Sequence, residues 1–118
     1  MRAALRRLHS PDVFDLVNYQ PDPADDFGFL LQALVGPEGG VGEESFDFVV
    51  CTPKWLERRR KKSDVIFGRH HLIMFEYDYD RLLRTIEHLC DSAEGNSWDE
   101  IATKLARFGK WEFEDYKD

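Results

Sequence analysis

The chain has 118 residues, of which 42% are hydrophobic and 33% charged, and its formal net charge is −7. This length suits one hydrophobic core, so we expect residues 1–118 to form a single domain, and the composition is not that of a disordered chain. No apolar run approaches the roughly 18 residues that span a membrane, and the amino terminus lacks the apolar run of a signal peptide. We therefore expect a cytoplasmic protein with no membrane partner.

Charges of opposite sign are separated along the chain. Residues 8–53 contain no lysine or arginine, and basic residues return in the run 54–62. The acidic stretch carries nine carboxylates, namely Asp12, Asp15, Asp22, Asp25, Asp26, Glu38, Glu43, Glu44 and Asp47. An acidic surface repels phosphate and attracts basic protein surfaces over roughly 8 Å, the Debye length at physiological salt. The charge pattern therefore favours a protein partner over nucleic acid.

The first half of the chain predicts three strands. In chain order we expect a strand over residues 2–9, an acidic loop over 10–26, a strand over 27–35, a glycine-rich turn over 36–42 and a strand over 43–52. The loop holds three prolines and five aspartates, which disfavour regular structure. The strand over 27–35 is apolar on both faces, as in the middle of a sheet, and the glycine turn after it predicts a hairpin.

A short helix and a fourth strand are predicted next. Thr52 is placed to cap the helix, and Pro53 occupies its first position, where a missing N–H is harmless. The basic run 54–62 follows on this helix. Residues 69–77 are rich in apolar and aromatic side chains and predict a strand.

Two longer helices are predicted from their caps and apolar stripes. Asp78 is a plausible N-cap of the first, and Ser97 with Glu100 forms a capping box at the start of the second. The stripes are Leu82, Ile86, Leu89, Cys90 and Ala93 in the first helix, and Trp98, Ile101, Ala102, Leu105 and Phe108 in the second. Alternation of aromatic and acidic residues over 110–116 predicts a closing strand.

This order of elements predicts an α+β fold. We expect an antiparallel sheet of about five strands with a helical pair packed mainly on one face. The residues expected in the core are Phe46, Phe48, Leu82, Ile86, Trp98 and Leu105.

The sequence contains no convincing catalytic or metal-binding motif. The turn over 36–42 lacks the lysine that ends a phosphate-binding loop, and it carries acidic residues. His70 and His71 are adjacent in a predicted strand, so their side chains point to opposite faces. Cys51 and Cys90 lie in apolar stripes, and we interpret them as buried thiols. We expect no catalytic residue, no metal and no cofactor, although a small hydrolase that uses buried carboxylates is an alternative.

The basic run is the feature that fits a protein-binding function least well. Residues 58–62 are all lysine or arginine, and they could contact nucleic acid. A solvated helix end is the favoured interpretation, because only one such cluster occurs, the sequence before it is acidic, and cations suit the negative end of the helix dipole. A small nucleic-acid-binding or regulatory module that uses residues 54–62 is therefore the alternative hypothesis.

The acidic surface itself is the main candidate for a binding site. Acidic residues occur beside aromatic ones, such as Phe14, Tyr19 and Phe27, and again at the end of the chain. Aromatic anchors supply affinity, whereas complementary charge raises the encounter rate and selectivity. The predicted partner-binding residues are Asp22, Asp25, Asp26, Glu43, Glu44, Glu112, Glu114 and Asp115.

Several segments resemble the immunity protein 8 family of bacterial polymorphic toxin systems. The similar segments are Leu8–Asp12, Phe27–Leu56, Phe67–Asp80 and Trp111–Tyr116, which together cover nearly the whole chain. The most specific parts are the sequence GEESF at Gly42–Phe46 and the sequence CTPKWL at Cys51–Leu56.

The resemblance implies a protein that acts by binding a partner protein and not by catalysis. Proteins of this kind are encoded beside a secreted toxin, bind its toxic domain inside the producing cell and neutralise it without catalysis. Many such toxins attack nucleic acid and have basic clefts, which would fit an acidic surface. The resemblance thus implies a cognate toxin domain as the partner, and the oligomeric state stays open.

Overall fold

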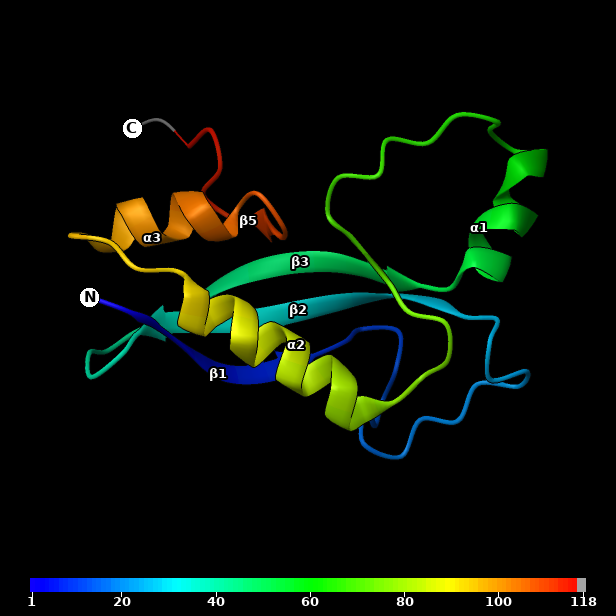
Figure 1. Ribbon diagram of the computed structural model, residues 1–118, viewed down its shortest axis with the longest axis horizontal. Helices are drawn as coiled ribbons and strands as arrows, with labels where there is room; N and C mark the ends of the chain where they lie inside the picture. The colour runs from blue at the N-terminus through cyan, green and yellow to red at the C-terminus, as the bar shows by residue number, and fades with distance from the viewer. Residues whose placement is uncertain (117–118) are drawn as a thin grey trace.

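The computed structural model describes residues 1–116 (Figure 1). In chain order its elements are β1 (Ala3–His9), β2 (Gly28–Pro37), β3 (Glu44–Cys51), α1 (Pro53–Arg58), the 3-10 turn η1 (Arg59–Lys61), β4 (His71–Ile73), α2 (Tyr79–Ser92), α3 (Trp98–Leu105) and β5 (Lys110–Trp111). The predicted order of strands and helices is confirmed, and so is the α+β fold.

The five strands form one open sheet in which β3 is central. The order is β1-β2-β3-β4, and β5 also pairs with β3. The pairings of β1 with β2, β2 with β3 and β3 with β5 are antiparallel. By contrast, β4 runs parallel to β3, which the long connection through α1 permits. Two short strands thus share one edge of β3, with β5 beside Phe46 and Asp47 and β4 beside residues 49–51.

Both β4 and β5 are shorter than the sequence predicts, for different reasons. The expected strand over 69–77 pairs only at His71–Ile73, and the backbone of His70 just before it has a φ of 67°, which interrupts an extended chain. The expected strand over 110–116 pairs only at Lys110–Trp111 and then turns. β4 is therefore confined between β5 and the end of β3, whereas β5 runs away from β4 and is ended by the turn over 112–115.

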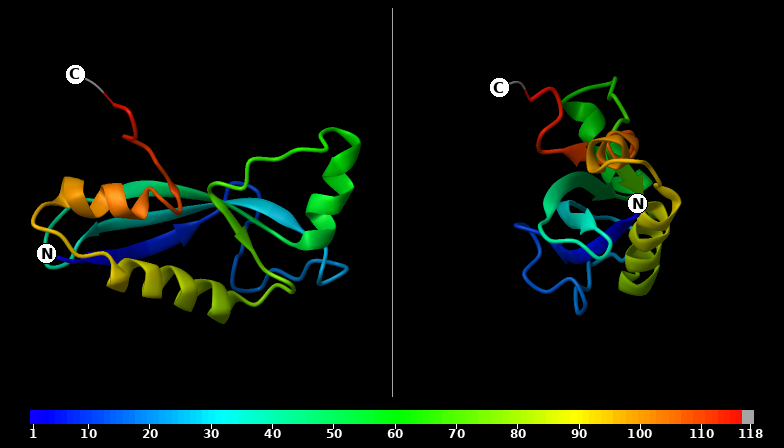
Figure 2. Two further views of the ribbon diagram at one scale, coloured as in Figure 1. Left: turned by 45° about the horizontal axis from the view of Figure 1, so that its top comes forward. Right: turned by 90° about the vertical axis from the view of Figure 1, so that its left-hand side faces the viewer.

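One face of the sheet is covered by α2 and α3, and the core lies beneath them (Figure 2). Alternate residues of β2 and β3 point to this face, as their burial patterns show. Five of the six predicted core residues are buried, and Trp98 is partly buried against the core. Phe108 differs from its prediction: it is 54% exposed, because α3 ends at Leu105 and the chain turns before the stripe reaches it.

The acidic loop before β2 is held in place by its few apolar residues. Val13 and Leu16 are buried, and the carbonyl of Leu16 accepts a hydrogen bond from the Tyr77 hydroxyl. Phe27 is also buried, so of the three aromatic residues that accompany the acidic groups, only Phe14 is fully exposed. The loop therefore presents its carboxylates from a defined position.

Helix α1 is docked at the end of β3 nearest this loop. The hydroxyl oxygen of Thr52 caps it by accepting from Trp55 N at 3.3 Å, and the same oxygen accepts from Phe27 N at 3.1 Å. The Trp55 indole lies against Gly28, where an added Cβ would stand 2.1 Å from the ring. This close approach needs glycine, and it places the basic run beside the acidic loop.

Candidate functional site

The eight predicted partner-binding carboxylates lie in separate places rather than on one surface. Asp22, Asp25 and Asp26 precede β2, next to the end of β3, whereas Glu43 and Glu44 lie at the start of β3. An eight-residue strand spans roughly 26 Å, so these groups are at opposite ends of the sheet, as Figure 1 shows. The remaining three, Glu112, Glu114 and Asp115, follow β5, whose partner residues lie near the start of β3.

The basic run folds back onto the acidic loop. Lys54 Nζ lies 2.7 Å from Asp25 Oδ2, and Arg58 Nη2 lies 2.8 Å from Asp26 Oδ1. The hydrogen bond from Lys54 lowers the pKa of Asp25, so this carboxylate is charged at neutral pH. Exposed ion pairs contribute little to stability. Their consequence here is electrostatic, because part of the negative charge of the loop is balanced within the molecule.

The carboxylates near the start of β3 are also engaged. Glu43 pairs with Arg7 at 2.9 Å, and Glu44 Oε1 accepts a hydrogen bond from Trp111 Nε1 at 2.7 Å. Glu112 Oε1 accepts from Ser45 N at 2.8 Å.

Glu114 also has a partner, because it pairs with Arg69. Among the described residues, only two of the eight carboxylates have neither an ion pair nor a side-chain hydrogen bond. Asp22 and Asp115 form neither an ion pair nor a side-chain hydrogen bond within residues 1–116, and both are exposed. The sequence could not reveal these pairings, because most of the partners are distant along the chain and meet only after folding.

The basic run does not form one free cationic surface. Besides the pairs of Lys54 and Arg58, Arg60 pairs with Glu57 at 2.8 Å. The Arg59 guanidinium lies over the Trp55 ring, 4.6 Å from its centroid. Within the part of the chain that the structure describes, Lys61 and Lys62 remain without an ion pair, which leaves a small basis for the nucleic-acid hypothesis.

The histidines and cysteines do not converge. His70 Nε2 lies 3.3 Å from the carbonyl of Ala106, whereas His71 Nδ1 lies near the carbonyls of its own loop. No group of three or more potential metal ligands is found in residues 1–116. Cys51 and Cys90 are free and buried as predicted, and burial raises the pKa of Cys90 to about 11, which keeps the thiol protonated.

Asp47 is an unusual carboxylate in the middle of β3. It points to the face of the sheet opposite the helices, with Gln32 and Lys110 as its cross-strand neighbours. Its Oδ1 atom is buried without a hydrogen-bond partner in the described chain. Burial raises its pKa, and the nearby Glu112 carboxylate adds to the rise, while Lys110 and Gln32 oppose it. Folding therefore disfavours the charged form.

Replacement of Asp47 by asparagine should stabilise the protein at neutral pH. The folded-state pKa lies above the unfolded one, so the wild type loses stability as pH rises from the unfolded value through the folded value. The gain should be near zero at about pH 3.5 and reach up to about 1 kcal/mol at about pH 7, after allowance for screening by solvent. Urea unfolding of both proteins at these two pH values measures it. An equal difference at both would contradict the charge explanation.

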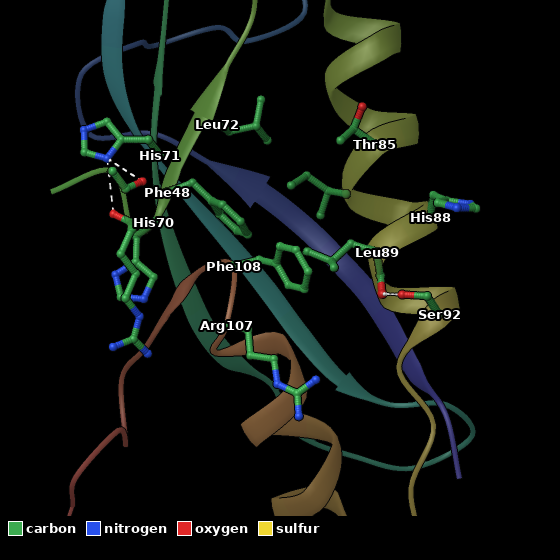
Figure 3. Close-up of a pocket in the computed structure, with 13 residues that line it drawn as sticks. Phe48, His70, His71, Leu72, Thr85, His88, Leu89, Ser92, Arg107 and Phe108 are labelled. Atoms are coloured by element: carbon green, nitrogen blue, oxygen red, sulfur yellow. Dashed lines mark hydrogen bonds between the residues drawn. The ribbon is translucent and has the colours of Figure 1, made fainter. Parts of the chain in front are cut away.

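A cleft of about 490 Å³ opens between β4, α2 and the turn that follows α3 (Figure 3). Its apolar lining consists of Phe48, Leu72, Ile86, Leu89 and Phe108, and Arg69 and Arg107 lie beside them. The rings of His71 and His88 point away from its centre. The sequence alone does not reveal this cleft. The one local signal was the position of Phe108 in the apolar stripe predicted for residues 98–108. That position is equally consistent with a core residue.

Within residues 1–116, no helix has the length and hydrophobicity needed to cross a membrane.

A comparison with protein family models identifies the family of this chain. A family model described as Immunity protein 8 matches residues 3–116, which is nearly the whole chain. The comparisons with curated proteins and with solved structures each found no significant match. The family consists of immunity proteins of toxin systems, whose function implies a toxin protein as partner. The chain therefore belongs to the immunity protein 8 family.

Proposed function

We propose that this protein binds and neutralises the toxic domain of a cognate polymorphic toxin in the cytoplasm of the cell that makes both. The observation that carries the proposal is the family match, which extends over residues 3–116 and thus over every strand and helix of the fold. The protein acts by covering the surface of the toxin in a stoichiometric complex and catalyses no reaction. Such a complex buries about 1,600 Å² in total.

The contact residues that we propose are the eight carboxylates at the ends of the sheet. Their positions on opposite sides of the molecule mean that one toxin surface reaches either the group around Asp22 or the group around Glu43, unless it spans the sheet. Most of them already hold an intramolecular cation or donor, such as Lys54 at Asp25. A basic toxin surface therefore competes with these internal partners, and Asp22 is, with Asp115, one of the two carboxylates available for a first encounter without such competition in residues 1–116.

Reversal of the charge at Asp22 should slow association with the toxin domain. Asp22→Lys removes an exposed negative charge that has no internal ion pair in residues 1–116, so folding is retained while attraction of a basic surface weakens. We expect the association rate at low salt to fall about 2–10-fold, and the difference to shrink as salt is added.

Glu87→Lys is the matched control for this experiment. It makes the same change in net charge, but Glu87 is exposed on α2, outside the proposed contact residues. Stopped-flow mixing with the purified toxin domain encoded beside the gene measures both rates. Equal slowing by the two variants would show that only net charge matters and would remove Asp22 from the proposed contacts.

The alternative function is a small nucleic-acid-binding module that uses residues 54–62. This alternative is less favoured because Lys54, Arg58 and Arg60 form ion pairs with carboxylates of the same chain. Lys61 and Lys62 are exposed and have no ion pair within residues 1–116, so they could still contact a phosphate backbone. A gel shift with steep salt dependence, lost on replacing these two lysines, would support the alternative.

A further inference from the structure

We infer that the cleft between β4, α2 and the turn after α3 is the docking site for an apolar side chain carried on an acidic segment of the toxin domain. The inference rests on the proposed function and adds to it the chemistry of one contact. It concerns a surface other than the eight carboxylates, although one of them, Glu114, pairs with Arg69 in the wall of the cleft.

The interior of the cleft is apolar and large enough for a side chain of the partner. Figure 3 shows Phe48, Leu72 and Phe108 turned toward its centre from three different elements, with Leu89 opposite them on α2. A volume of about 490 Å³ lies within the range of pockets that hold a ligand, about 300–1,000 Å³. Phe108 leaves more than half of its surface exposed here, and an aromatic residue at the centre of a concave site is typical of an interface hot spot.

The walls of the cleft are held in place without a partner. Arg69 Nη2 donates to the carbonyl of Ala106 at 3.2 Å and also pairs with Glu114, which ties the loop before β4 to the end of α3. At Gly109 the backbone passes so close to Phe48 that an added Cβ would stand 2.6 Å from the ring. A cavity whose walls are already fixed loses less entropy on binding than one that has to form.

A strained residue lies in the same wall. His70 has a φ of 67°, a left-handed conformation that residues other than glycine rarely adopt. Strain of this kind persists where surrounding contacts impose it, and it is concentrated at functional sites. In this protein the ring of His70 contacts the carbonyl of Ala106. The strained residue is therefore part of the same wall that Arg69 ties to the end of α3.

The charge around the cleft determines the class of the occupant. Among residues 1–116, no aspartate or glutamate lines it, and its arginines are Arg69, which is paired with Glu114, and Arg107. Arg107 is exposed and forms no ion pair within residues 1–116. A guanidinium matches a carboxylate with two parallel hydrogen bonds, so the occupant that complements this cleft has an acidic residue beside its apolar one. Within the described chain, Arg107 thus provides one unpaired positive charge at the cleft, in a protein whose net charge is −7.

The test compares cleft variants with matched variants elsewhere. Arg107→Glu and Phe108→Ala change exposed side chains, so both should fold; their controls are Arg84→Glu on α2 and Phe75→Ala after β4, also exposed and outside the cleft. The probe is the purified toxin domain encoded beside the gene, inactivated in its own active site. Calorimetric titration should show at least tenfold weaker binding for each cleft variant and less than threefold change for each control. Added salt should reduce the Arg107→Glu effect only.

The outcomes separate this inference from the proposed function. If the wild type binds the toxin domain and both cleft variants bind it equally well, the inference fails and the proposed function stands. If the wild type does not bind, the proposed function fails and the inference with it. An effect of Arg107→Glu alone would indicate charge attraction without an apolar anchor and would overturn the inference. The inference would also be overturned if the cleft variants left toxin affinity unchanged but altered the sedimentation mass of the free protein. The cleft would then join two copies of this chain.

Discussion

Replacement of Phe46 by alanine should lower the free energy of unfolding by about 3–5 kcal/mol, a large part of the stability of a domain of this size. Phe46 is 1% exposed and lies in β3 beneath the helices. Its ring stacks on Trp111 of β5 with centroids 6.3 Å apart, and it meets the edge of Trp98 at the start of α3. Alanine would leave a cavity where three elements join, so β5 and α3 should loosen with the loss of β3 packing.

Phe14→Ala is the matched control, because Phe14 is fully exposed in the acidic loop. It should change the free energy of unfolding by less than about 0.5 kcal/mol. Urea denaturation followed by far-ultraviolet circular dichroism measures both variants. A loss below about 1 kcal/mol for Phe46→Ala would contradict the placement of this ring at the centre of the core.

Replacement of Gly28 by alanine should destabilise the protein by about 1–3 kcal/mol, because the new methyl group cannot fit. Its carbon would lie 2.1 Å from the Trp55 indole, so either β2 or α1 has to move. The expected result is that α1 leaves its place on the sheet. Lys54 and Arg58 would then lose their positions beside Asp25 and Asp26, and the acidic loop would carry more uncompensated charge.

Gly68→Ala tests whether the effect is steric. No atom of residues 1–116 would lie within 4 Å of the added Cβ at Gly68, and its backbone does not need glycine, so the stability should hardly change. Thermal unfolding gives the stability of both variants, and near-ultraviolet circular dichroism reports the environment of the tryptophans. An undisturbed Gly28→Ala protein would show that Trp55 does not pack on the strand.

The sequence predicts the elements of this fold because their signals are local. Thr52, Asp78 and Ser97 each accept a hydrogen bond at the start of the helix they were expected to cap. The capping box differs in one detail: the Glu100 carboxylate accepts from Asn96 N rather than from Ser97 N. The glycine turn produces the hairpin of β2 and β3 in the expected place.

Features that depend on distant residues could not be predicted in the same way. The pairs of Lys54 with Asp25 and of Arg69 with Glu114 join segments that meet only in the folded chain. The length of β4 depends on the space that β5 leaves on one edge of β3, which no local pattern encodes. The cleft is of the same kind, because its lining residues come from β3, β4, α2 and the turn after α3.

These ion pairs change how the separation of charge in the sequence is understood. The acidic stretch and the basic run look like opposing surfaces in the sequence, but α1 brings part of the run onto the loop before β2. The protein is therefore not a simple mimic of a polyanion. We expect its complex to combine charge attraction at the ends of the sheet with an apolar contact, as is typical of specific protein interfaces.

The most direct test of the proposed function is the growth of cells that make the toxin domain encoded by the adjacent gene. The toxin domain is induced with and without this protein, and the amount of each protein is followed by immunoblot. We predict that toxin alone stops growth and that co-expression restores it, in proportion to the amount of this protein. Equal arrest in both cultures, with this chain folded and at least as abundant as the toxin, would contradict the proposal that it is an immunity protein for that toxin.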